Sequence, residues 1–220
     1  MLKVVVVGSS GHAGVVIDAM LRSSTVQIAG LLDDFLPPGT CRHDYPVLGP
    51  VDQIADLAQT YSYSACTIAV GDNWRRRELS LRVSACMPDV ELIGVVHPAS
   101  CVARSARLGA GAFVAAGAVV GPNSNIGAGC IVNTGATVDH DCRLDAFSSV
   151  APGVHLGGYV HIEEMSAIGI GAVVSHRVAV GRHTVVGAGA VVVSDVPGEV
   201  VAYGVPARTI RSRRPDEPYL

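Results

Sequence analysis

A six-residue repeat runs without a break from Val96 to Pro197, and it limits what this chain can fold into. The first position of each block is aliphatic, and the fifth position is small or β-branched. A period of six fits neither the turn of an α-helix nor the two-residue alternation of one long strand. It predicts a stack of similar coils, in which each short strand points one aliphatic side chain inward. The seventeen block starts are Val96, Val102, Leu108, Val114, Val120, Ile126, Val132, Val138, Leu144, Val150, Leu156, Ile162, Ile168, Val174, Val180, Val186 and Val192.

The first 95 residues show a different pattern, in which predicted strands alternate with predicted helices. We expect strands at 2–7, 26–32 and 65–70, helices at 15–22, 51–61 and 75–84, and a link into the coil at 91–96. Such alternation predicts a small parallel sheet covered by helices, as in half of a Rossmann fold. The chain is therefore expected to hold a Rossmann-like α/β domain at 1–95, a coil domain at 96–200 and a C-terminal tail at 201–220.

Composition and charge argue against several classes of function. The net charge of −3 gives no electrostatic reason to expect nucleic acid or an anionic membrane as a partner. Hydrophobic residues make up 49% of the chain and aromatic residues 5%, which suits a coil core of Val, Ile, Leu and Ala. No apolar run reaches transmembrane length, so we expect a soluble, cytoplasmic protein. The arginine runs at 75–77 and 211–214 are interpreted mostly as solvated surface.

The six cysteines are scattered along the chain, without a C-x-x-C pair. Cys130 and Cys142 occupy inward fifth positions of their blocks, where a thiol behaves as a small core side chain. We therefore expect neither a disulfide nor a metal site from the cysteines.

A glycine-rich turn at 8–14 follows the first predicted strand. Such a turn presents backbone N–H groups and a helix N-terminus, which favours a phosphate group, although a purely structural tight turn fits the same residues. Asp33 and Asp34 end the second strand, where open α/β sheets bind ligands. They could accept hydrogen bonds from a ribose or a base, or they could be solvated turn residues. Because only half of a dinucleotide fold is present, a mononucleotide or nucleotide sugar fits better than NAD.

A polar stretch at 133–142 interrupts the small and apolar residues of the coil, and within it His140 lies between Asp139 and Asp141. A carboxylate beside an imidazole selects its tautomer and supports its basicity, which suits a general base near neutral pH. A surface histidine in an acidic corner is the alternative. Gly158 lies eighteen residues beyond His140, one coil further on, and would leave open space and an N–H group beside the ring.

Ile170 and Ala188 are also eighteen residues apart and share a column. They could form an apolar wall for an extended arm such as pantetheine, or they could be ordinary residues at the edge of the core. His140 and His176 share another column but lie two coils apart, roughly 9.6 Å at the usual strand spacing. This distance is too long for both histidines to bind one metal ion within a subunit.

The repeat resembles that of the hexapeptide-repeat acyltransferases, and four motifs narrow the resemblance. They are the turn with Gly8, Ser10, Gly11 and His12; Leu32-Asp33-Asp34; Val70-Gly71-Asp72-Asn73 with Arg76; and Asn133-Thr134 with His140-Asp141. The ending at 203–208 resembles the G-x-P-A-[KR] close of many such enzymes. Residues 1 to about 210 are thus similar to the family of sialic acid O-acetyltransferases and bacterial nucleotide-aminosugar N-acetyltransferases. The resemblance implies a left-handed parallel β-helix with three blocks to a turn, and a homotrimer with each active site between neighbouring subunits.

The same resemblance implies roles for individual residues. His140 matches the general base, and Asp141 matches the acidic residue that supports it. Ser149 stands near the thioester of acetyl-CoA, where some members have a histidine. The nucleotide-sugar positions are Ser10, Gly11, His12, Asp33, Asp34, Gly71 and Asn73, and the other acetyl-CoA positions are Gly158, Ile170 and Ala188.

The reaction implied is direct, metal-free transfer of an acetyl group from acetyl-CoA to the 4-amino group of a UDP- or GDP-linked 4-amino-4,6-dideoxy sugar. Oxygen acetylation of sialic acid or a related sugar is the first alternative. A non-catalytic coil scaffold or a metal enzyme is the second, since some carbonic anhydrases use the same coil fold. Their pattern has another histidine shortly after the second, and residues 177–182 of this chain supply none.

Overall fold

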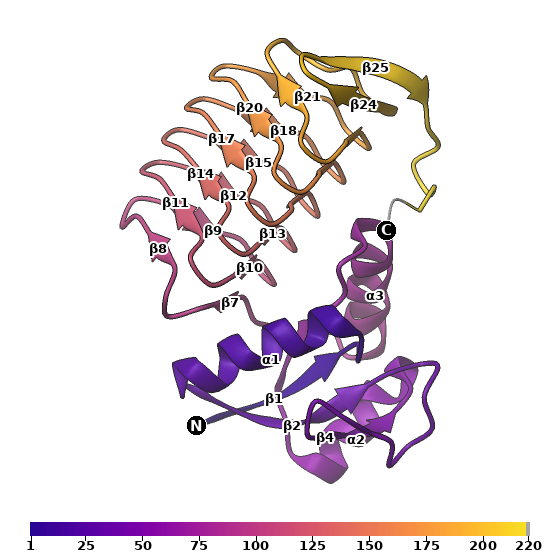
Figure 1. Cartoon of the computed structure of the whole chain (residues 1–220). Coiled ribbons are helices and arrows are strands. Elements are labelled where there is room, and N and C mark those ends of the chain that lie inside the picture. Colours follow the sequence, from indigo (N-terminus) through magenta and orange to yellow (C-terminus); the bar gives the residue numbers. More distant parts are fainter. Residues whose placement is uncertain (219–220) are drawn as a thin grey trace. The chain divides into compact units, whose positions relative to one another are not determined.

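The computed structural model describes residues 1–218, which form two compact units (Figure 1). Unit 1 comprises Met1–Gly71 and Arg75–Pro98, and unit 2 comprises Asp72–Trp74 and the chain from Ala99 onward. Unit 1 holds the sheet and helices of the N-terminal region, and unit 2 holds the coil.

Unit 1 is built on a six-stranded sheet in the order β3-β4-β2-β1-β5-β6. The central strand β1 pairs in parallel with β2 and β5, and only the edge strand β3 runs antiparallel to its neighbour. Helices α1 and α2 pack against this sheet. The elements are β1 (Leu2–Val7), α1 (Gly11–Ser23), β2 (Val26–Leu32), β3 (Cys41–Arg42), β4 (Tyr45–Gly49), the 3₁₀ helix η1 (Val51–Gln53), α2 (Ile54–Tyr61), β5 (Ala65–Ile68), α3 (Asn73–Cys86), β6 (Glu91–Leu92) and β7 (Val95–Val96).

The apolar run of β1 explains its central place in the sheet. Val4, Val5, Val6 and Val7 are all 0% exposed, as expected for a parallel strand covered on both faces. The predicted ranges of β1 and β2 match the structure at both ends. The Rossmann-like α/β class predicted for this region is confirmed.

Unit 1 differs from the prediction in several places; β5 ends two residues earlier than expected, and α3 is two residues longer at each end. Helix α1 begins at Gly11, directly after the glycine turn, and the helix expected at 51–61 divides into η1 and α2. The hairpin of β3 and β4 was not predicted at all. Its turn residues His43 and Asp44 have φ of 49° and 67°, and Pro46 interrupts the strand pattern. Proline weakens the sequence signal of a strand, because it cannot donate to the ladder of hydrogen bonds.

Unit 2 contains the predicted coil, in which each block supplies one two-residue strand ending on its aliphatic block start. These strands are β8 (Cys101–Val102), β9 (Arg107–Leu108), β10 (Phe113–Val114), β11 (Val119–Val120), β12 (Asn125–Ile126), β13 (Ile131–Val132), β14 (Thr137–Val138), β15 (Arg143–Leu144), β16 (Ser149–Val150), β17 (His155–Leu156), β18 (His161–Ile162), β19 (Ala167–Ile168), β20 (Val173–Val174), β21 (Ala179–Val180), β22 (Val185–Val186) and β23 (Val191–Val192). Two longer strands, β24 (Val200–Gly204) and β25 (Ala207–Ser212), follow the repeat.

Strands three blocks apart pair in parallel and form three sheets along the coil axis. The pairing joins residues eighteen apart, as between Thr137 and His155 or between Val150 and Ile168. The block starts from Val114 to Val192 are at most 2% exposed and form one continuous core. Small fifth-position side chains, including Cys130 and Cys142, fill the space between them and are also buried. The eighteen-residue register therefore sets which side chains lie next to each other.

The coil turns through residues with positive φ that recur every eighteen positions. One column of them is all glycine, but the other two are not. We call the second column the Asp141 corner; it consists of Asn123, Asp141, Tyr159 and Arg177, with φ between 57° and 61°. Asn and Asp adopt this left-handed conformation more readily than other residues with a side chain. The glycine column is Gly117, Gly135, Gly153, Gly171 and Gly189, and the third is Gly111, Gly129, Phe147, Met165 and His183.

The two ends of the coil differ. At the first end Leu108 is 37% exposed, although it is a block start. At the last end β24 pairs in parallel with β22 and in antiparallel with β25. Part of the region expected as a C-terminal tail is thus a hairpin that extends one sheet of the coil, as terminal elements of repeat folds commonly do.

Because the central block starts are fully enclosed, truncation there should be far more costly than at the open end. We expect Ile162→Ala to lower the free energy of unfolding by about 2–5 kcal/mol. The matched variant Leu108→Ala should lower it by roughly 1 kcal/mol or less, because Leu108 keeps much of its solvent contact. Urea titrations followed by circular dichroism measure both values. Equal losses would contradict the burial described for these two leucine-sized side chains.

Candidate active site

His140 and Asp141 form a hydrogen-bonded pair in the turn between β14 and β15. His140 Nδ1 lies 2.8 Å from Asp141 Oδ2, and the two side chains are 48% and 31% exposed. The backbone N–H of His140 also donates to Asp139 Oδ1 at 2.8 Å. An ionised carboxylate only accepts hydrogen bonds, so His140 must place a proton on Nδ1 to make this contact. In neutral His140 the lone pair is then on Nε2.

Asp141 is held from two sides. Its Oδ1 accepts a hydrogen bond from Asn123 Nδ2 at 3.2 Å, while its Oδ2 faces His140. The hydrogen bonds from His140 and Asn123 keep the pKa of Asp141 below its usual range. Asp141 therefore stays ionised at neutral pH and can orient the imidazole.

Gly158 lies directly against the His140 ring, as the eighteen-residue register predicts. A Cβ at Gly158 would lie 2.6 Å from His140 Nε2, so any larger residue would displace the ring. Within residues 1–218, the Gly158 N–H donates no hydrogen bond. The pair of Nε2 and a backbone N–H is suited to taking a proton and to stabilising a developing oxyanion.

A surface cleft of about 470 Å³ surrounds His140 and Gly158. Tyr159 meets the His140 ring edge-on, with ring centroids 5.2 Å apart, and Arg177 lies over Tyr159 at 5.4 Å. The sequence prediction missed Tyr159 and Arg177, although counting eighteen and thirty-six residues from Asp141 reaches them. The lining is Asp139, His140, Gly157, Gly158, Tyr159, Ser175, His176 and Arg177.

The other predicted acetyl-CoA residues lie elsewhere on the coil. Ser149 is on β16, between Ile131 and Ala167 of the neighbouring strands. Ile170 and Ala188 stack in one column, as predicted, and Ile170 is 62% exposed. Ile170 is twelve residues, or two sides of the coil, beyond Gly158. Within one chain the structure does not bring these three residues into the cleft with His140.

In unit 1, the predicted nucleotide-sugar residues lie along the carboxyl edge of the parallel sheet. Ser10 precedes α1 and Gly11 begins it, and Asp33 follows the adjacent strand β2. The Ser9 hydroxyl donates to Asp33 Oδ2, which ties the two strand ends together. His43, from the hairpin that was not predicted, contacts the carbonyl oxygens of Ser9 and Ser10 through Nε2 at 3.1 and 3.0 Å.

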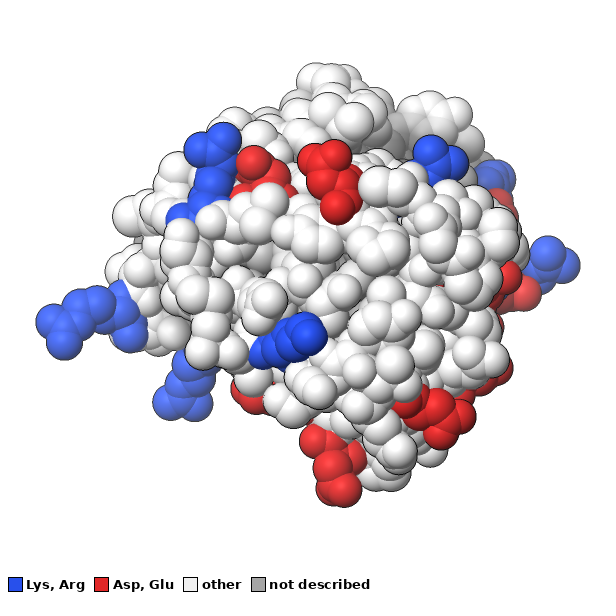
Figure 2. Space-filling view, turned by 90° about the horizontal axis from the view of Figure 1, so that it is seen from below, with Lys and Arg blue, Asp and Glu red and all other residues white. Residues whose placement is uncertain are grey.

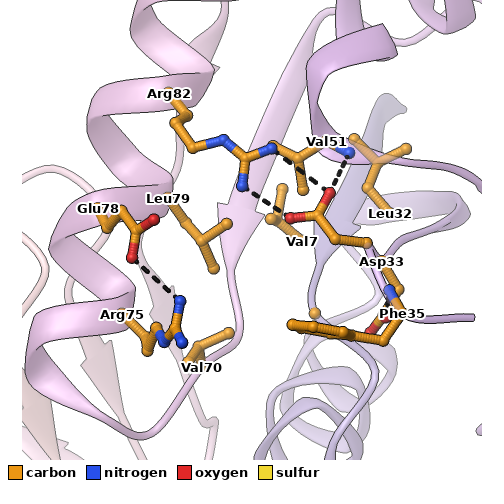
Figure 3. Close-up of a pocket in the computed structure, with 12 residues that line it drawn as sticks. Val7, Leu32, Asp33, Phe35, Val51, Val70, Arg75, Glu78, Leu79 and Arg82 are labelled. Carbon is orange, nitrogen blue, oxygen red and sulfur yellow. Dashed lines mark hydrogen bonds and ion pairs between the residues drawn. The ribbon is translucent and has the colours of Figure 1, made fainter.

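A pocket of about 330 Å³ opens at this edge (Figure 3). Of the residues predicted to bind the nucleotide sugar, only Asp33 and Asp34 belong to the described lining of this pocket. Helix α3 supplies the wall that the sequence prediction missed; Figure 3 shows the side chains of Arg75, Glu78, Leu79 and Arg82 facing the strand ends. Their spacing of three, four and seven residues places them on one face of a helix. The remaining lining is Val7, Gly8, Leu32, Phe35, Val51 and Val70.

Asp34 forms an ion pair with Arg82 at the pocket wall. Arg82 Nη1 lies 2.7 Å from Asp34 Oδ2, and the Val51 N–H donates to Asp34 Oδ1 at 3.0 Å. Burial raises the pKa of Asp34, but the hydrogen bonds from Arg82 and Val51 outweigh burial and leave the pKa below its usual value. Asp33 Oδ1 accepts from the Phe35 N–H at 2.8 Å. Both aspartates thus shape the turn after β2 as well as the pocket.

Arg76 is buried near this edge, and the half-buried His12 has its Nε2 atom enclosed. Arg76 is 1% exposed and donates from Nη1 to the carbonyl oxygens of Val70 and Gly71 at 3.0 and 2.8 Å. Burial, reinforced by the Arg76 charge, lowers the pKa of His12 to about 4. Most arginines of the two runs are exposed, as expected; the exceptions are Arg76 and Arg213, which is 7% exposed and donates to the His183 carbonyl.

Asn73 belongs to the short segment that is part of unit 2. Its side chain is 1% exposed, and its amide Nδ2 lies 3.2 and 3.1 Å from the carbonyl oxygens of Met165 and Ser166. The structure therefore gives this predicted substrate residue a buried position with backbone partners.

Charge and metal chemistry add little to the description of the site. Over the face seen in Figure 2, acidic and basic side chains are spread among a larger uncharged area. Residues 1–218 contain no group of three or more His, Cys, Asp or Glu side chains placed to hold a metal ion. No helix in that range is long and apolar enough to cross a lipid bilayer.

A parallel coil of six-residue blocks with a His–Asp pair in its cleft defines the class of hexapeptide-repeat acyltransferases. Comparison with known proteins agrees. Residues 3–83 match the PglD N-terminal domain family. The UDP-N-acetylbacillosamine N-acetyltransferase of Bacillus subtilis (strain 168) is 33% identical over 116 residues, or 53% of this chain and 52% of that protein. The match thus spans about half the length of that curated relative.

Two solved structures are similar over nearly the whole chain. The acetyltransferase domain of PglB from Neisseria gonorrhoeae FA1090, in complex with acetyl coenzyme A, is 38% identical with a TM-score of 0.87; the match covers 94% of this chain and 98% of that one. A mutant perosamine N-acetyltransferase from Caulobacter crescentus, in complex with CoA and GDP-perosamine, is 37% identical with a TM-score of 0.89, covering 96% and 97%. The chain belongs to this family of hexapeptide-repeat aminosugar N-acetyltransferases, and its predicted left-handed β-helix is confirmed.

The half-buried His12 should make the stability of the protein depend on pH. The pKa of His12 is about 4 in the folded chain and near 6.5 in the unfolded chain. The unfolded state therefore binds more protons between these values, and the folded state loses up to about 3 kcal/mol as the pH falls from 6.5 toward 4. Urea titrations near pH 7.5 and pH 5 should show a smaller loss for His12→Asn than for the unmodified protein. An equal loss in both proteins would show that His12 is not the group responsible.

Proposed function

We propose that this protein is an acetyl-CoA-dependent N-acetyltransferase that acts on the 4-amino group of a UDP- or GDP-linked 4-amino-4,6-dideoxy sugar. One observation carries the proposal: His140 Nδ1 is bound to Asp141, while Nε2 lies against Gly158 in an open cleft. The complexes of similar proteins with acetyl coenzyme A, and with CoA and GDP-perosamine, support the choice of substrates.

The proposed reaction is direct transfer between two bound substrates. The sugar amine attacks the thioester carbonyl, so a C–N bond forms, and the C–S bond breaks when the tetrahedral intermediate collapses. His140 Nε2 takes the proton from the attacking nitrogen and returns it to the departing CoA thiolate. The Gly158 N–H stabilises the oxyanion. Holding both substrates together removes much of the entropic cost of their meeting.

The cysteines support a mechanism without an acyl-enzyme. Burial raises the pKa of Cys142 to about 11 and that of Cys66 to about 12. Cys130 is 0% exposed. Thiols that stay protonated and enclosed are poor nucleophiles.

We infer a homotrimer with each active site between subunits. His140 and Gly158 lie at one corner of the coil, whereas Ile170 and Ala188 lie two sides further on. A copy of the chain placed beside this one could bring the second corner to the first. Val119 and Val173 are 39% and 41% exposed on one outer face, which offers apolar surface for such contact. In this assembly Ser149, Ile170 and Ala188 would hold the acetyl-CoA arm beside His140.

The N-terminal domain would hold the nucleotide. Ser10, Gly11 and His12 form the N-terminal turn of α1, a suitable place for phosphate oxygens. Asp33, Asp34, Gly71 and Asn73 remain proposed nucleotide-sugar positions. The pocket between α3 and the ends of β1 and β2 is lined by apolar side chains together with charged ones, as suits a base and ribose.

A ligand panel should separate the candidate functions. A compound that binds only the folded state raises the midpoint of thermal unfolding, and we expect this from acetyl-CoA and from one of the UDP- or GDP-4-amino-4,6-dideoxy sugars. An acetyl-transfer assay with the same sugars should then release CoA. Stabilisation and turnover with sialic acid instead would move the assignment to O-acetylation. Failure of acetyl-CoA to stabilise the protein at saturating concentration would end the enzyme assignment.

His140→Asn should lower kcat by about 10²–10⁴, the usual contribution of a general base, and leave the thermal midpoint nearly unchanged. The chain offers a matched control, because His161 Nε2 also lies 2.8 Å from a carboxylate, that of Asp145, but outside the cleft. His161→Asn should keep kcat within about twofold. Normal turnover in His140→Asn, or equal losses in both variants, would refute the role of His140.

A further inference from the structure

In the Asp141 corner, Asn123 makes a hydrogen bond to Asp141 and has no role in the proposed reaction. Asn123 lies eighteen residues before Asp141, one coil earlier, and its Nδ2 donates to Asp141 Oδ1 at 3.2 Å. The other carboxylate oxygen, Oδ2, lies 2.8 Å from His140 Nδ1. We propose that Asn123 is a positioning residue that acts on His140 through Asp141, an inference that rests on the proposed role of His140 as the base.

Asn123 is itself held in place. Its backbone N–H donates to Ser105 Oγ at 3.0 Å, one further coil back in the same column. Its φ of 60° is left-handed, a conformation that asparagine adopts more readily than most residues with a side chain. The left-handed turn and the hydrogen bond to Ser105 thus both restrain the backbone that carries the Asn123 amide.

The restraint matters because Asp141 is not enclosed by packing. Its side chain is 31% exposed, and the terminal torsion of an aspartate is broad. Without Asn123, the remaining partners of the carboxylate would be His140 and, more weakly, Tyr159, so the carboxylate could rotate and exchange oxygens or turn to water. The hydrogen bond from Asn123 occupies Oδ1 and leaves Oδ2 facing Nδ1, which keeps the proton on Nδ1 and the lone pair on Nε2.

A second residue of this column also contacts the imidazole. Tyr159 meets the ring edge-on at 5.2 Å, and Arg177 lies over Tyr159. Tyr159 and Arg177 are bulky residues at φ of 61° and 60°, where a side chain is unfavourable. The titratable groups around His140 are Asp139 and Asp141 from its own turn, and Tyr159, His176 and Arg177 from the following coils. Within residues 1–218, Asp141 is the member of this group that makes a hydrogen bond to the imidazole.

The decisive variant is Asn123→Gly, because glycine accepts the left-handed turn while removing the amide. We expect kcat to fall about 10- to 100-fold, by analogy with the loss when a hydrogen-bond partner of a metal-binding histidine is removed, with KM for both substrates within about twofold. In ¹⁵N NMR of the full-length protein, the share of His140 carrying its proton on Nδ1 should drop. Asn123→Asp cannot donate and repels Asp141, so it should lower the share of His140 protonated on Nδ1 more than Asn123→Gly does. It should also move the acid limb of the pH profile of kcat by more. Ser24→Gly, at a positive-φ residue in unit 1, controls for the added glycine.

Two results would overturn the proposal. One is Asn123→Gly with unchanged kcat and unchanged His140 tautomer, which would leave Asn123 as a corner residue only. The other is a fall in kcat that follows a lower thermal midpoint while the tautomer stays as in the unmodified protein. The NMR measurement needs no substrate, so the link from Asn123 to His140 is tested even if no nucleotide sugar is acetylated.

Discussion

The parallel pairing of residues eighteen apart is the interaction on which the rest of this structure depends. Each rung places one aliphatic side chain over the previous one, as with Val150 over Val132, and the core is continuous along the axis. Because short strands bury little surface individually, their stability comes from this stacking. A shift of the register by one residue would move every aliphatic side chain off the core, so burial and register support each other.

The same register builds the chemistry of the coil. It places Asn123, Asp141, Tyr159 and Arg177 in one column, and His140 against Gly158 in the next. Such a column brings together functional groups that are distant in sequence without a long loop. The column requires residues with side chains to adopt positive φ. The free-energy cost of this conformation is small for Asn and Asp and larger for Tyr and Arg. The column of glycines avoids this cost at another corner, where no side chain is needed.

In the N-terminal unit, functional residues are brought together in a different way, at the common carboxyl edge of a parallel sheet. The carboxyl ends of β1 and β2 lie side by side, and the turn after each contributes to one pocket. Buried Arg76 ties down the turn after β5 through two carbonyl oxygens, a role that a charged residue fills only when its donors are satisfied. The low pKa of His12 reflects the same enclosure.

The sequence determined by itself the coil, its eighteen-residue columns, the ends of β1 and β2, and the pairing of His140 with Asp141 and Gly158, because periodicity and adjacency are properties of the chain. It did not reveal the β3–β4 hairpin, the wall of α3, or the burial of Arg76, which depend on contacts between segments. It placed Ser149, Ile170 and Ala188 with His140 by resemblance, yet one chain leaves them on other sides of the coil. Only the tertiary structure decided which side chain partners each charge, since hydrogen bonding depends on distance and direction that no spacing specifies.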